Sequence, residues 1–588
     1  MLKEAVYHRP GECWAYGYDP HTVHLRLRTS KGDRLAVQVL YGDKCTPWAH
    51  MLKAEMKHLS SDELFDYWQA EVHPPYGRLS YGFVLIEGSE RVWYTERGFH
   101  QSEPKEHLGL FEFPFLHPID VHTPPEWVKE SVFYQIFPER FANGDTDNDP
   151  GQTERWGGKP SYTNFFGGDL QGVRDHLDHL TELGVNAIYF TPIFESPTNH
   201  KYDTRDYYRV DPHFGTTDTL RDLVKDCHAK GIRVILDGVF NHSGITFPFF
   251  QDVLEKGPDS KYYDWFHIQE WPLQVNDGIP TYRTFAFERT MPKLNTANPE
   301  VKDYLLKLGR YWIEETDIDG WRLDVANEVD HAFWRDFRQA VKEVKADAYI
   351  LGEVWHDGMM WLLGEQFDGV MNYPLCDAVL DFFVFGHDDA YSFAAKIGGY
   401  LARYPKQVTE SLFNHLDTHD TARLLTLCKG DIRKMKLAVV FQFTYIGAPS
   451  IYYGDEIGLA GEFDPDNRRP MIWERERQNR ELYDFYRTLA VLRRSHSALF
   501  NGEFRIRSAE RDSNVLVYER QHGCEHLIVA MNRGSEQADV HVSWGSMRWH
   551  DVFGSEETQP IDRPSQHTLG AYEFRVWLNQ EQDTCRTN

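Results

Sequence analysis

Four short segments of the chain combine acidic residues with arginine, histidine or tryptophan, and each follows apolar residues. They are Asp237-Gly-Val-Phe-Asn241-His242, Arg322-Leu-Asp324, Glu353-Val-Trp355 and Asp417-Thr-His419-Asp420. Residues two apart on a β-strand point to the same face, so Arg322 lies beside Asp324 and Glu353 beside Trp355. Carboxyl groups held close together raise each other's pKa, which a general acid working near neutral pH requires. The spacing therefore predicts acid–base chemistry at one site. For any single acid, the alternative is a buried ion pair or a loop cap.

The elements that must position these acids alternate between strands and amphipathic helices. Apolar residues recur at helical spacing from Leu170 to Leu183, for example, and Gly184 follows as a helix C-cap. Such alternation is typical of a parallel sheet in an α/β fold, and eight units predict a (β/α)₈ TIM barrel with its catalytic groups at the carboxyl ends of the strands. The expected strands are 132–137, 187–191, 233–237, 319–324, 349–354, 369–373, 412–416 and 450–454.

The segments on either side of the barrel have the alternating pattern of strands instead. Residues 1–123 predict an N-terminal β-sandwich that ends where prolines concentrate, at Thr123-Pro-Pro125. The expected catalytic barrel spans residues 124–500. Its interval from about 240 to 299 has no clear helix and predicts an inserted subdomain after the third strand. Residues 501–588 predict a C-terminal β-sandwich.

The composition excludes several kinds of partner. Among 588 residues, 63 are basic and 90 acidic, and a net charge of -27 repels nucleic acid. No apolar run is long enough to span a bilayer and the first residues lack the apolar core of a signal peptide, so we expect no membrane contact and a cytoplasmic location. The 7 scattered cysteines indicate reduced thiols. Aromatic residues, at 14% of the chain, favour a flat ligand with apolar faces, such as a sugar ring.

The four acidic segments, in this order and at this spacing, resemble the signatures of the α-amylase family of glycoside hydrolases. The resemblance covers the whole chain, from the N-terminal sandwich to the C-terminal one. Met291-Pro-Lys-Leu-Asn295 and Val325-Ala-Asn-Glu328 look like signatures of the subgroup of neopullulanases, cyclomaltodextrinases and maltogenic amylases. Many other amylases carry Lys-His where this chain has Asn327 and Glu328, so the departure points to the subgroup.

The resemblance implies a role for each acid: Asp324 as nucleophile, Glu353 as general acid/base and Asp420 as the carboxylate that stabilises the transition state. A retaining glycosidase needs a nucleophile and a protonated acid about 5–5.5 Å apart. We expect Arg322 to keep Asp324 ionised by charge and hydrogen bonding, and Glu353 to hold its proton through burial and nearby negative charge. With Arg322, the expected substrate-binding residues are Tyr202, His242, Phe285, Glu328, Trp355 and His419.

These substrate contacts differ in kind. The resemblance implies that His242 and His419 hydrogen-bond sugar hydroxyls and that Tyr202 stacks on the same sugar ring. Phe285 and Trp355 would stack on substrate, with a place in the protein core as the alternative. Glu328 would shape the leaving-group side of the site; alternatively it is an acid favoured by the dipole at a helix start.

Oxygen-rich residues just after the first barrel strand predict a structural calcium ion. Asn143, Asp145, Asn148 and Asp149 offer donors at short spacing, and the resemblance adds Gly167 and Asp169. An EF-hand is excluded, because Pro150 and Trp156 occupy the positions that demand glycine and glutamate. Asp147 is not part of the match. The alternative is a solvated turn.

The resemblance implies a retaining hydrolase of α-1,4-glucosidic bonds that acts on cyclomaltodextrins, pullulan and maltooligosaccharides, with some transglycosylation. The alternatives are a chain that is mainly a transglycosylase or an α-1,6-glucosidase, and a catalytically inactive carbohydrate-binding protein. The inactive protein would need a damaged carboxylate or a blocked barrel mouth. The resemblance also implies a homodimer in which the N-terminal domain narrows the partner's cleft. A starch-binding role for that domain is the alternative.

Overall fold

Eight parallel strands form a barrel in the computed structural model, which describes residues 1–542, 549–554 and 565–579. The strand order is β20-β19-β18-β15-β12-β11-β22-β21, and a parallel bridge between Met371 and Phe413 joins the two ends. The predicted barrel is therefore confirmed. Its strands are β11 (Phe133–Ile136), β12 (Ala187–Phe190), β15 (Arg233–Gly238), β18 (Gly320–Leu323), β19 (Tyr349–Gly352), β20 (Gly369–Val370), β21 (Phe413–Asn414) and β22 (Ala448–Tyr452).

The barrel strands alternate between two apolar layers. Along β12, Ala187 and Tyr189 belong to one buried cluster, whereas Ile188 and Phe190 belong to the larger one, which includes apolar residues of the surrounding helices. Gly320 has φ +155, and a Cβ there would lie 2.1 Å from the carbonyl oxygen of Tyr349, so the close approach of β18 and β19 requires glycine.

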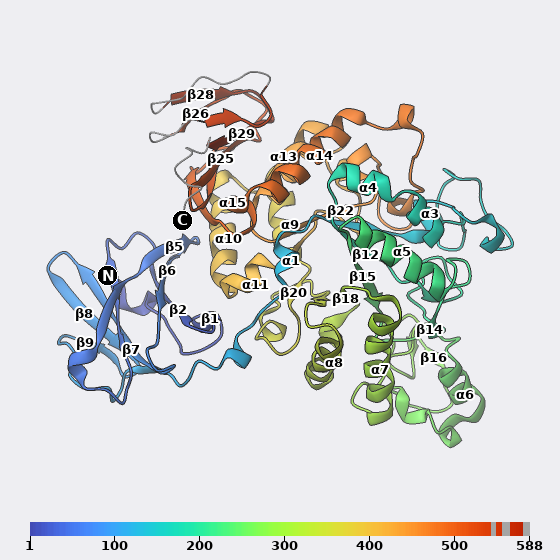
Figure 1. The fold of residues 1–588 in the computed structure, drawn as a ribbon, viewed down its shortest axis with the longest axis horizontal. Helices are drawn as coiled ribbons and strands as arrows, with labels where there is room; N and C mark the ends of the chain where they lie inside the picture. Colours follow the sequence, from blue (N-terminus) through green and yellow to red (C-terminus); the bar gives the residue numbers. More distant parts are fainter. Residues whose placement is uncertain (543–548, 555–564, 580–588) are drawn as a thin grey trace.

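The barrel helices surround these strands (Figure 1). The predicted helix from Leu170 to Leu183 is present as two, interrupted at His176, and Gly184 ends it with φ +94. The main helices are α3 (Leu170–Asp175), α4 (Leu177–Leu183), α5 (Thr217–Ala229), α7 (Pro299–Thr316), α8 (His331–Val344), α9 (Tyr373–Val379), α10 (Ala390–Arg403), α11 (Lys406–Glu410), α13 (Ile432–Thr444) and α14 (Arg480–Ser495).

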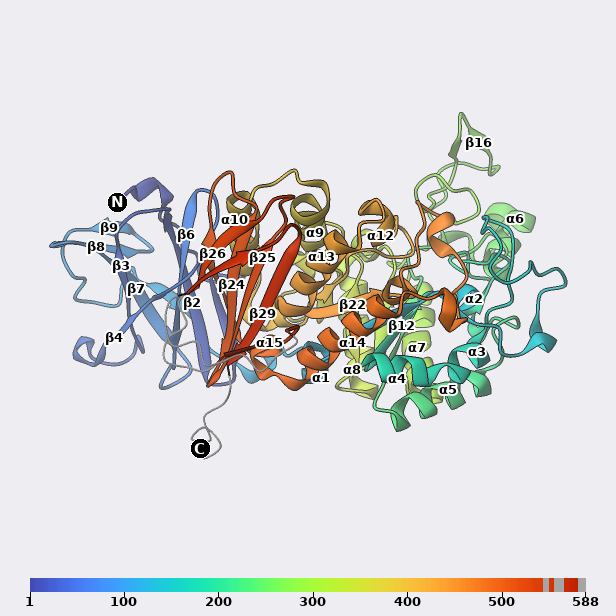
Figure 2. The ribbon, with the colours of Figure 1, turned by 90° about the horizontal axis from the view of Figure 1, so that it is seen from above.

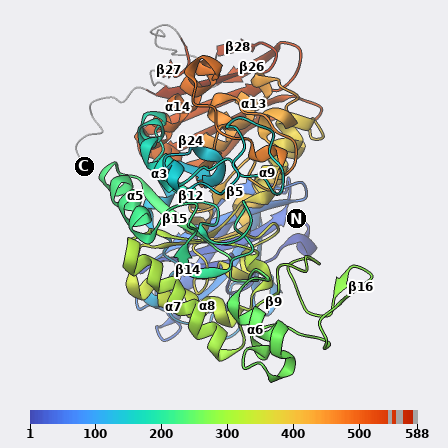
Figure 3. The same cartoon turned by 90° about the vertical axis from the view of Figure 1, so that its right-hand side faces the viewer.

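The segment that follows β15 extends beyond the barrel, and its hairpin projects from the molecule (Figure 3). It contains α6 (Pro248–Lys256) and the hairpin of β16 (Val275–Asn276) and β17 (Ile279–Pro280). The expectation of no clear helix here is wrong, because Phe250 and Val253 give α6 one buried face.

The N-terminal domain consists of two antiparallel sheets that enclose a separate apolar core. One sheet has the order β1-β2-β6-β5, and the other β4-β3-β7-β8-β9, with β10 paired to β7. The predicted sandwich is confirmed. Its strands are β1 (Ala15–Asp19), β2 (Thr22–Ser30), β3 (Ala36–Gly42), β4 (Leu52–Glu55), β5 (Lys57–Ser61), β6 (Phe65–Val72), β7 (Leu79–Glu87), β8 (Glu90–Thr95), β9 (Gly98–His100) and β10 (Phe111–Phe113).

The C-terminal domain also has two layers, and Figure 2 shows its strands next to α13 and α15 (Ser497–Phe500). A sheet of order β23-β24-β25-β29-β27 packs on the pair β26–β28, with Val517 and Ile528 against Val540 and Leu569. Part of the predicted range 501–588 lies outside the described residues. The strands are β23 (Glu503–Ala509), β24 (Val515–His522), β25 (Glu525–Asn532), β26 (Ala538–Val542), β27 (Trp549–Asp551), β28 (Ser565–Leu569) and β29 (Glu573–Asn579).

The structure bears on the expected absence of membrane contact and on the expected state of the cysteines. Within the described residues, no helix combines the length and the hydropathy that crossing a bilayer requires. Cys524 is disulfide-bonded, so the expectation of reduced thiols alone is wrong at this residue. The free cysteines are Cys13, Cys45, Cys227, Cys376 and Cys428.

Candidate active site

A cavity of about 470 Å³ lies at the carboxyl ends of the barrel strands. Asp324 follows β18, Glu353 follows β19, and Asp420 lies in the loop after β21, and all three line this cavity. The carboxylates predicted from three separate segments therefore surround one space. Acids at strand ends can meet in this way because a closed parallel barrel brings all its carboxyl ends to one face.

Arg322 holds the carboxylates together from below. It is fully buried in β18, and its Nη1 lies 2.9 Å from Asp324 Oδ1 and 2.9 Å from Asp237 Oδ2. Its Nη2 lies 3.0 Å from Glu353 Oε1. One planar guanidinium thus contacts three acids from three strand ends, which a lysine could not do. Arg322 was predicted to contact substrate, but its burial confines it to these carboxylates.

Negative charge exceeds positive charge in this cluster. Burial, followed by the charge of Glu353, raises the pKa of Asp324 well above its ordinary range, although Arg322 opposes the shift. Burial also raises the pKa of Asp237 to about 6. Arg322 thus acts on Asp324 in the expected direction, but burial and the charge of Glu353 together outweigh it. The charge of Glu353 disfavours a second negative charge on Asp324.

Glu353 is oriented by two donors. The backbone N–H of Val325 donates to Glu353 Oε2 at 2.8 Å, and the indole Nε1 of Trp355 donates to Oε1 at 3.0 Å. Val325 has φ +46, an uncommon conformation for a β-branched residue, and backbone strain of this kind is concentrated at functional sites. Half-exposed Trp355 lines the cavity and stacks on Tyr373, with ring centroids 4.0 Å apart.

Tyr202 and His419 form a stacked pair beside the acids. Their rings are 5.4 Å apart and nearly parallel, and the Tyr202 hydroxyl lies 2.5 Å from His419 Nε2 and 3.0 Å from Asp237 Oδ2. Gln135 from β11 contacts His419 Nδ1 at 2.7 Å. His419 is fully buried, and burial lowers its pKa well below the ordinary value, so its ring is neutral. Tyr202 lines the cavity, whereas His419 supports it from behind.

His242 lies across the cavity against Phe285. The two rings stack with centroids 5.2 Å apart, and both residues line the cavity. Burial lowers the pKa of His242 to about 3. Its Nε2 is buried without a protein hydrogen-bond partner, which leaves one polar atom available to a ligand.

Glu328 lies outside the main cavity. It is half-exposed, and its Oε2 lies 3.2 Å from Lys293 Nζ in an adjoining pocket. Lys293, from the Met291–Asn295 motif, also donates to the side chain of Asn241. The two subgroup motifs are therefore in direct contact, and the neighbouring Asn327 lines the cavity instead of Glu328.

Sequence reasoning missed several residues of the cavity wall. Arg468 and Asp464 follow β22, and Arg468 Nη2 lies 3.3 Å from both Asp420 Oδ1 and Asp464 Oδ2. His200, two residues before Tyr202, also lines the cavity. Arg468 and Asp464 lie far from any strand end, so no position in the strand pattern marked them. His200 could have been predicted from the sequence, because it belongs to the segment that carries Tyr202.

The loop after β11 folds around Asp169, the N-cap residue of α3. Its carboxylate accepts hydrogen bonds from the backbone N–H groups of Gly144, Asp145 and Gly172 at 3.1, 2.8 and 2.6 Å. The side-chain amide of Asn148 donates to it at 3.1 Å. Asp169 therefore fixes the loop that contains the other predicted calcium ligands.

Oxygen atoms remain available in this loop. Asn143 Oδ1 and Asn148 Oδ1 are buried and have no hydrogen-bond partner, while Asn143 Nδ2 donates to Asp149 Oδ1 at 2.7 Å. Gly167 has φ +80, and a Cβ there would lie 2.2 Å from Asp149 Oδ1. Within the described residues, no group of three or more His, Cys, Asp or Glu side chains is arranged for a metal. The amide and carboxylate oxygens nevertheless fit a hard cation such as calcium.

Comparison with known proteins identifies the family. Residues 135–481 match the catalytic domain of α-amylase. The chain belongs to the α-amylase family of glycoside hydrolases. Residues 1–117 match the N-terminal Ig-like domain of α-amylase, and residues 504–576 the C-terminal domain of maltogenic amylase. The predicted family and enzyme class are confirmed.

Similar proteins within the α-amylase family cover nearly the whole chain. A cyclomaltodextrinase from a Bacillus species is 58% identical over 90% of this chain and 96% of its own. An intracellular maltogenic amylase from Bacillus subtilis is 45% identical, over 91% of this chain and 92% of its own. A solved structure of a cyclomaltodextrinase matches with a TM-score of 0.93 and 54% identity, covering 99% of this chain and 100% of the other. The predicted subgroup is confirmed.

Proposed function

We propose that this glycoside hydrolase cleaves α-1,4-glucosidic bonds with retention, through a covalent glucosyl-enzyme. The single observation that carries the proposal is the contact of one guanidinium, Arg322, with both Asp324 and Glu353 at the cavity. Carboxylates that share a guanidinium lie close together, as double displacement requires.

In the proposed reaction, Asp324 attacks the anomeric carbon and Glu353 protonates the leaving oxygen, then deprotonates the attacking water. The hydrogen bonds from Val325 N–H and Trp355 Nε1 hold Glu353 in position for both steps. Asp420 stabilises the positive charge that develops on the sugar ring. A general acid must carry a proton and a nucleophile must be ionised, and the contact with Arg322 supports the ionised form of Asp324.

Neutral aromatic and imidazole groups would bind the sugar at the cleavage point. Tyr202 offers its ring face to the cavity, and the unpartnered Nε2 of His242 offers one polar atom. Phe285 and Trp355 supply further apolar surface on either side. We assign His419 to the support of Tyr202, since its Nε2 lies against the tyrosine hydroxyl.

Proton NMR of the first product tests retention. The α-anomer should appear first and mutarotate later, whereas initial release of the β-anomer would refute the double displacement. Asp324→Asn should abolish turnover and leave the fold intact, because it removes the nucleophile without changing side-chain volume. Unchanged turnover in this variant would remove Asp324 from the mechanism.

The proposed substrates are cyclomaltodextrins, pullulan and maltooligosaccharides, with some transglycosylation. Similarity to proteins named cyclomaltodextrinase and maltogenic amylase over the full chain supports this choice. Initial rates on β-cyclodextrin, pullulan and starch should rank starch last. Product analysis at high acceptor concentration would reveal a chain that is mainly a transglycosylase. Release of maltose from α-1,6 branches would reveal an α-1,6-glucosidase.

We further propose a homodimer in which the N-terminal domain of each subunit narrows the partner's cleft and so excludes long starch chains. The match of residues 1–117 to a domain of the family supports a dedicated role for this sandwich. Light scattering should give twice the chain mass. A monomer that still prefers cyclodextrin to starch would remove this explanation, and binding of starch by the N-terminal domain would support the alternative.

Calcium is proposed as a structural ion of the loop after β11. Asn143, Asn148 and Asp149 would hold it, together with Asp145 and the Gly167 backbone, and Asp169 would fix the loop from behind. The bound ion would supply charge that orders the loop. Chelation with EDTA should lower the unfolding temperature and added calcium should restore it, and an unfolding temperature indifferent to both would refute the site.

A cytoplasmic location is proposed from the similarity to a protein named intracellular maltogenic amylase. Fractionation of the source cells should recover the activity with the cytoplasmic fraction. Recovery from the culture medium would contradict the proposal.

A further inference from the structure

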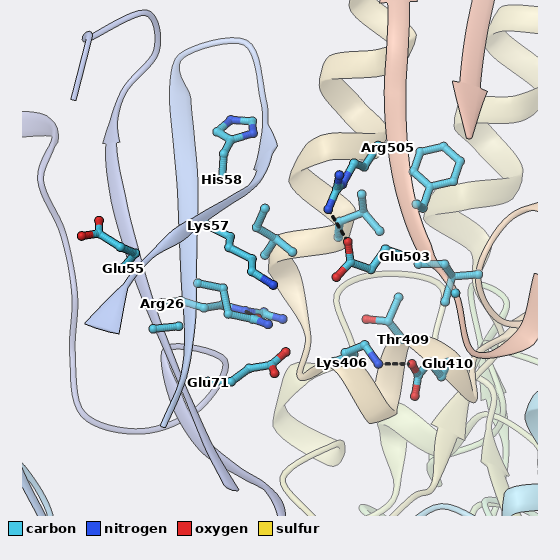
Figure 4. Close-up of a pocket in the computed structure, with 17 residues that line it drawn as sticks. Arg26, Glu55, Lys57, His58, Glu71, Lys406, Thr409, Glu410, Glu503 and Arg505 are labelled. Atoms are coloured by element: carbon cyan, nitrogen blue, oxygen red, sulfur yellow. Dashed lines mark hydrogen bonds and ion pairs between the residues drawn. The ribbon is translucent and has the colours of Figure 1, made fainter. Parts of the chain in front are cut away.

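A second cavity, of about 260 Å³, lies where the three domains meet. Figure 4 shows side chains of the N-terminal domain facing α11 of the barrel and β23 of the C-terminal domain. Arg26 and Lys57 point into it from the N-terminal sandwich, Thr409 and Glu410 belong to the barrel, and Glu503 belongs to β23. None of its lining residues lines the catalytic cavity.

Hydrogen bonds between the domains fix Arg26 in the wall of this junction cavity. Arg26 is buried, its Nη1 donates to the carbonyl oxygens of Ala402 and Tyr404 in the barrel, and its Nε and Nη2 bind Gln69 and Tyr16. These contacts use four of the five N–H donors of the guanidinium, so one remains for a ligand. Apolar side chains add a dry surface, among them Leu59, Leu401, Ile446 and Phe504.

The charged groups of the junction cavity balance in number. Four basic and four acidic side chains line it: Arg26, Lys57, Lys406 and Arg505, and Glu55, Glu71, Glu410 and Glu503. Two of the pairs are closed, because Lys406 Nζ lies 2.7 Å from Glu410 Oε1 and Arg505 Nη2 lies 2.5 Å from Glu503 Oε2. A charged ligand would be attracted by one set of these side chains and repelled by the other. A neutral ligand with many hydroxyl groups can instead hydrogen-bond to both members of each pair.

We propose that the junction cavity is a non-catalytic binding site for a neutral sugar. Its volume lies just below the range of about 300–1,000 Å³ for small-molecule sites, which indicates one pyranose unit, such as the end of a maltose molecule. Vicinal hydroxyls would bind the acids and Lys57, and the apolar face of the ring would lie on Phe504.

A sugar in this site would join all three domains. Besides Arg26, the hydroxyl of Ser60 binds the carbonyl of Gly398 at 2.8 Å, so the N-terminal domain already packs on α10 beside the cavity. A ligand that contacts the N-terminal domain, α11 and β23 together stabilises this arrangement, because it binds only when the three are assembled. The site would thus respond to free sugar by fixing the N-terminal domain against the barrel.

Calorimetric titration of the full chain carrying Asp324→Asn with maltose tests the proposal. Turnover is absent in this chain, so the result does not depend on the proposed reaction. We expect two classes of sites. Tyr202→Ala should remove one class, and Lys57→Ala combined with Glu503→Ala should weaken the other at least tenfold. Lys57 and Glu503 are exposed, so the fold should tolerate both changes.

The matched control removes an exposed lysine–acid pair elsewhere, Lys307 and Asp303 on α7, and should leave both classes unchanged. A single class of sites that Tyr202→Ala abolishes would overturn the proposal, as would two classes that the Lys57 and Glu503 changes leave intact. Inorganic phosphate or glycine that binds the junction as tightly as maltose would overturn the assignment to a neutral sugar.

Discussion

Replacement of Arg322 by methionine should move the acid limb of the pH–activity profile to higher pH. Asp324 must be ionised to attack, so activity falls as the pH drops through its pKa. Burial and Glu353 already raise that pKa, and Arg322 lowers it from 2.9 Å away. At an effective dielectric constant of about 20 and a charge separation of about 4 Å, the lost attraction is roughly 4 kcal/mol. This corresponds to an upward shift of about three pKa units.

The assay is kcat/KM on β-cyclodextrin over roughly pH 4 to 9, where the acid limb reports the ionisation of the free enzyme. Arg322→Met should lose about a thousandfold of activity at neutral pH and recover part of it at alkaline pH. Arg322→Lys keeps the positive charge but not the planar fork that contacts three acids, so its acid limb should move by about one unit or less. An acid limb that stays in place in Arg322→Met would refute the reasoning.

The stability of Arg322→Met should depend on pH in the opposite sense to its activity, because its loss of stability should be larger near neutral pH than in acid. A carboxyl with a raised pKa in the folded state favours folding at low pH, and this contribution is lost as the pH rises through the folded pKa. Arg322→Met leaves buried acids without their cation and should lower stability by about 3–5 kcal/mol near neutral pH, and by less in acid. Arg338→Met is the matched control. It removes a mostly buried cation that pairs with Asp368 at 2.8 Å, and it should lower stability without moving the activity profile.

Three further changes test individual contacts. Trp355→Phe keeps the stacking on Tyr373 but loses the hydrogen bond to Glu353, which should lower kcat/KM by about tenfold to a hundredfold; a smaller loss than in Trp355→Ala is required. Tyr202→Phe keeps the ring and loses the hydroxyl that contacts Asp237 and His419, so kcat should fall more than sugar binding weakens. A change confined to KM would contradict a role of this hydroxyl in positioning the acids. Gly167→Ala should lower the unfolding temperature, because its Cβ would clash at positive φ, and equal unfolding temperatures would contradict the loop geometry.

The sequence predicted those parts of the site that follow directly from strand pattern. Asp324 and Glu353 come directly after apolar strands, so the barrel hypothesis alone brought them to one face. Arg322 was correctly placed beside Asp324, because residues two apart on a strand share a face. The burial of Arg322 away from the cavity could not be predicted, because it depends on contacts with Asp237 and Glu353, which belong to other strand ends.

Contacts across the barrel were beyond the sequence for a geometric reason. Gln135 and His419 are 284 positions apart: Gln135 lies in the first barrel strand, β11, and His419 in the loop after the seventh, β21. Which side chains meet across the barrel depends on strand stagger, and that is fixed only when the sheet closes. Arg468 and Asp464 lie in a long loop without helical or strand periodicity, so nothing in their spacing pointed to Asp420.

The position of Asp237 explains how one cluster can be both stable and reactive. Its carboxylate accepts hydrogen bonds from Tyr189 at 2.7 Å and Tyr202 at 3.0 Å in addition to its contact with Arg322. Asp237 thus has its oxygens satisfied by protein groups, whereas Asp324 faces the cavity with Arg322 as its charged partner. Asp237 is a fixed acid at the base of the cluster and holds the guanidinium. Arg322 can therefore remain in place when Asp324 loses its negative charge on forming the proposed covalent bond. The same anchor connects Tyr202 to the acids, which joins the proposed recognition of the sugar ring to the proposed chemistry in one hydrogen-bonded network.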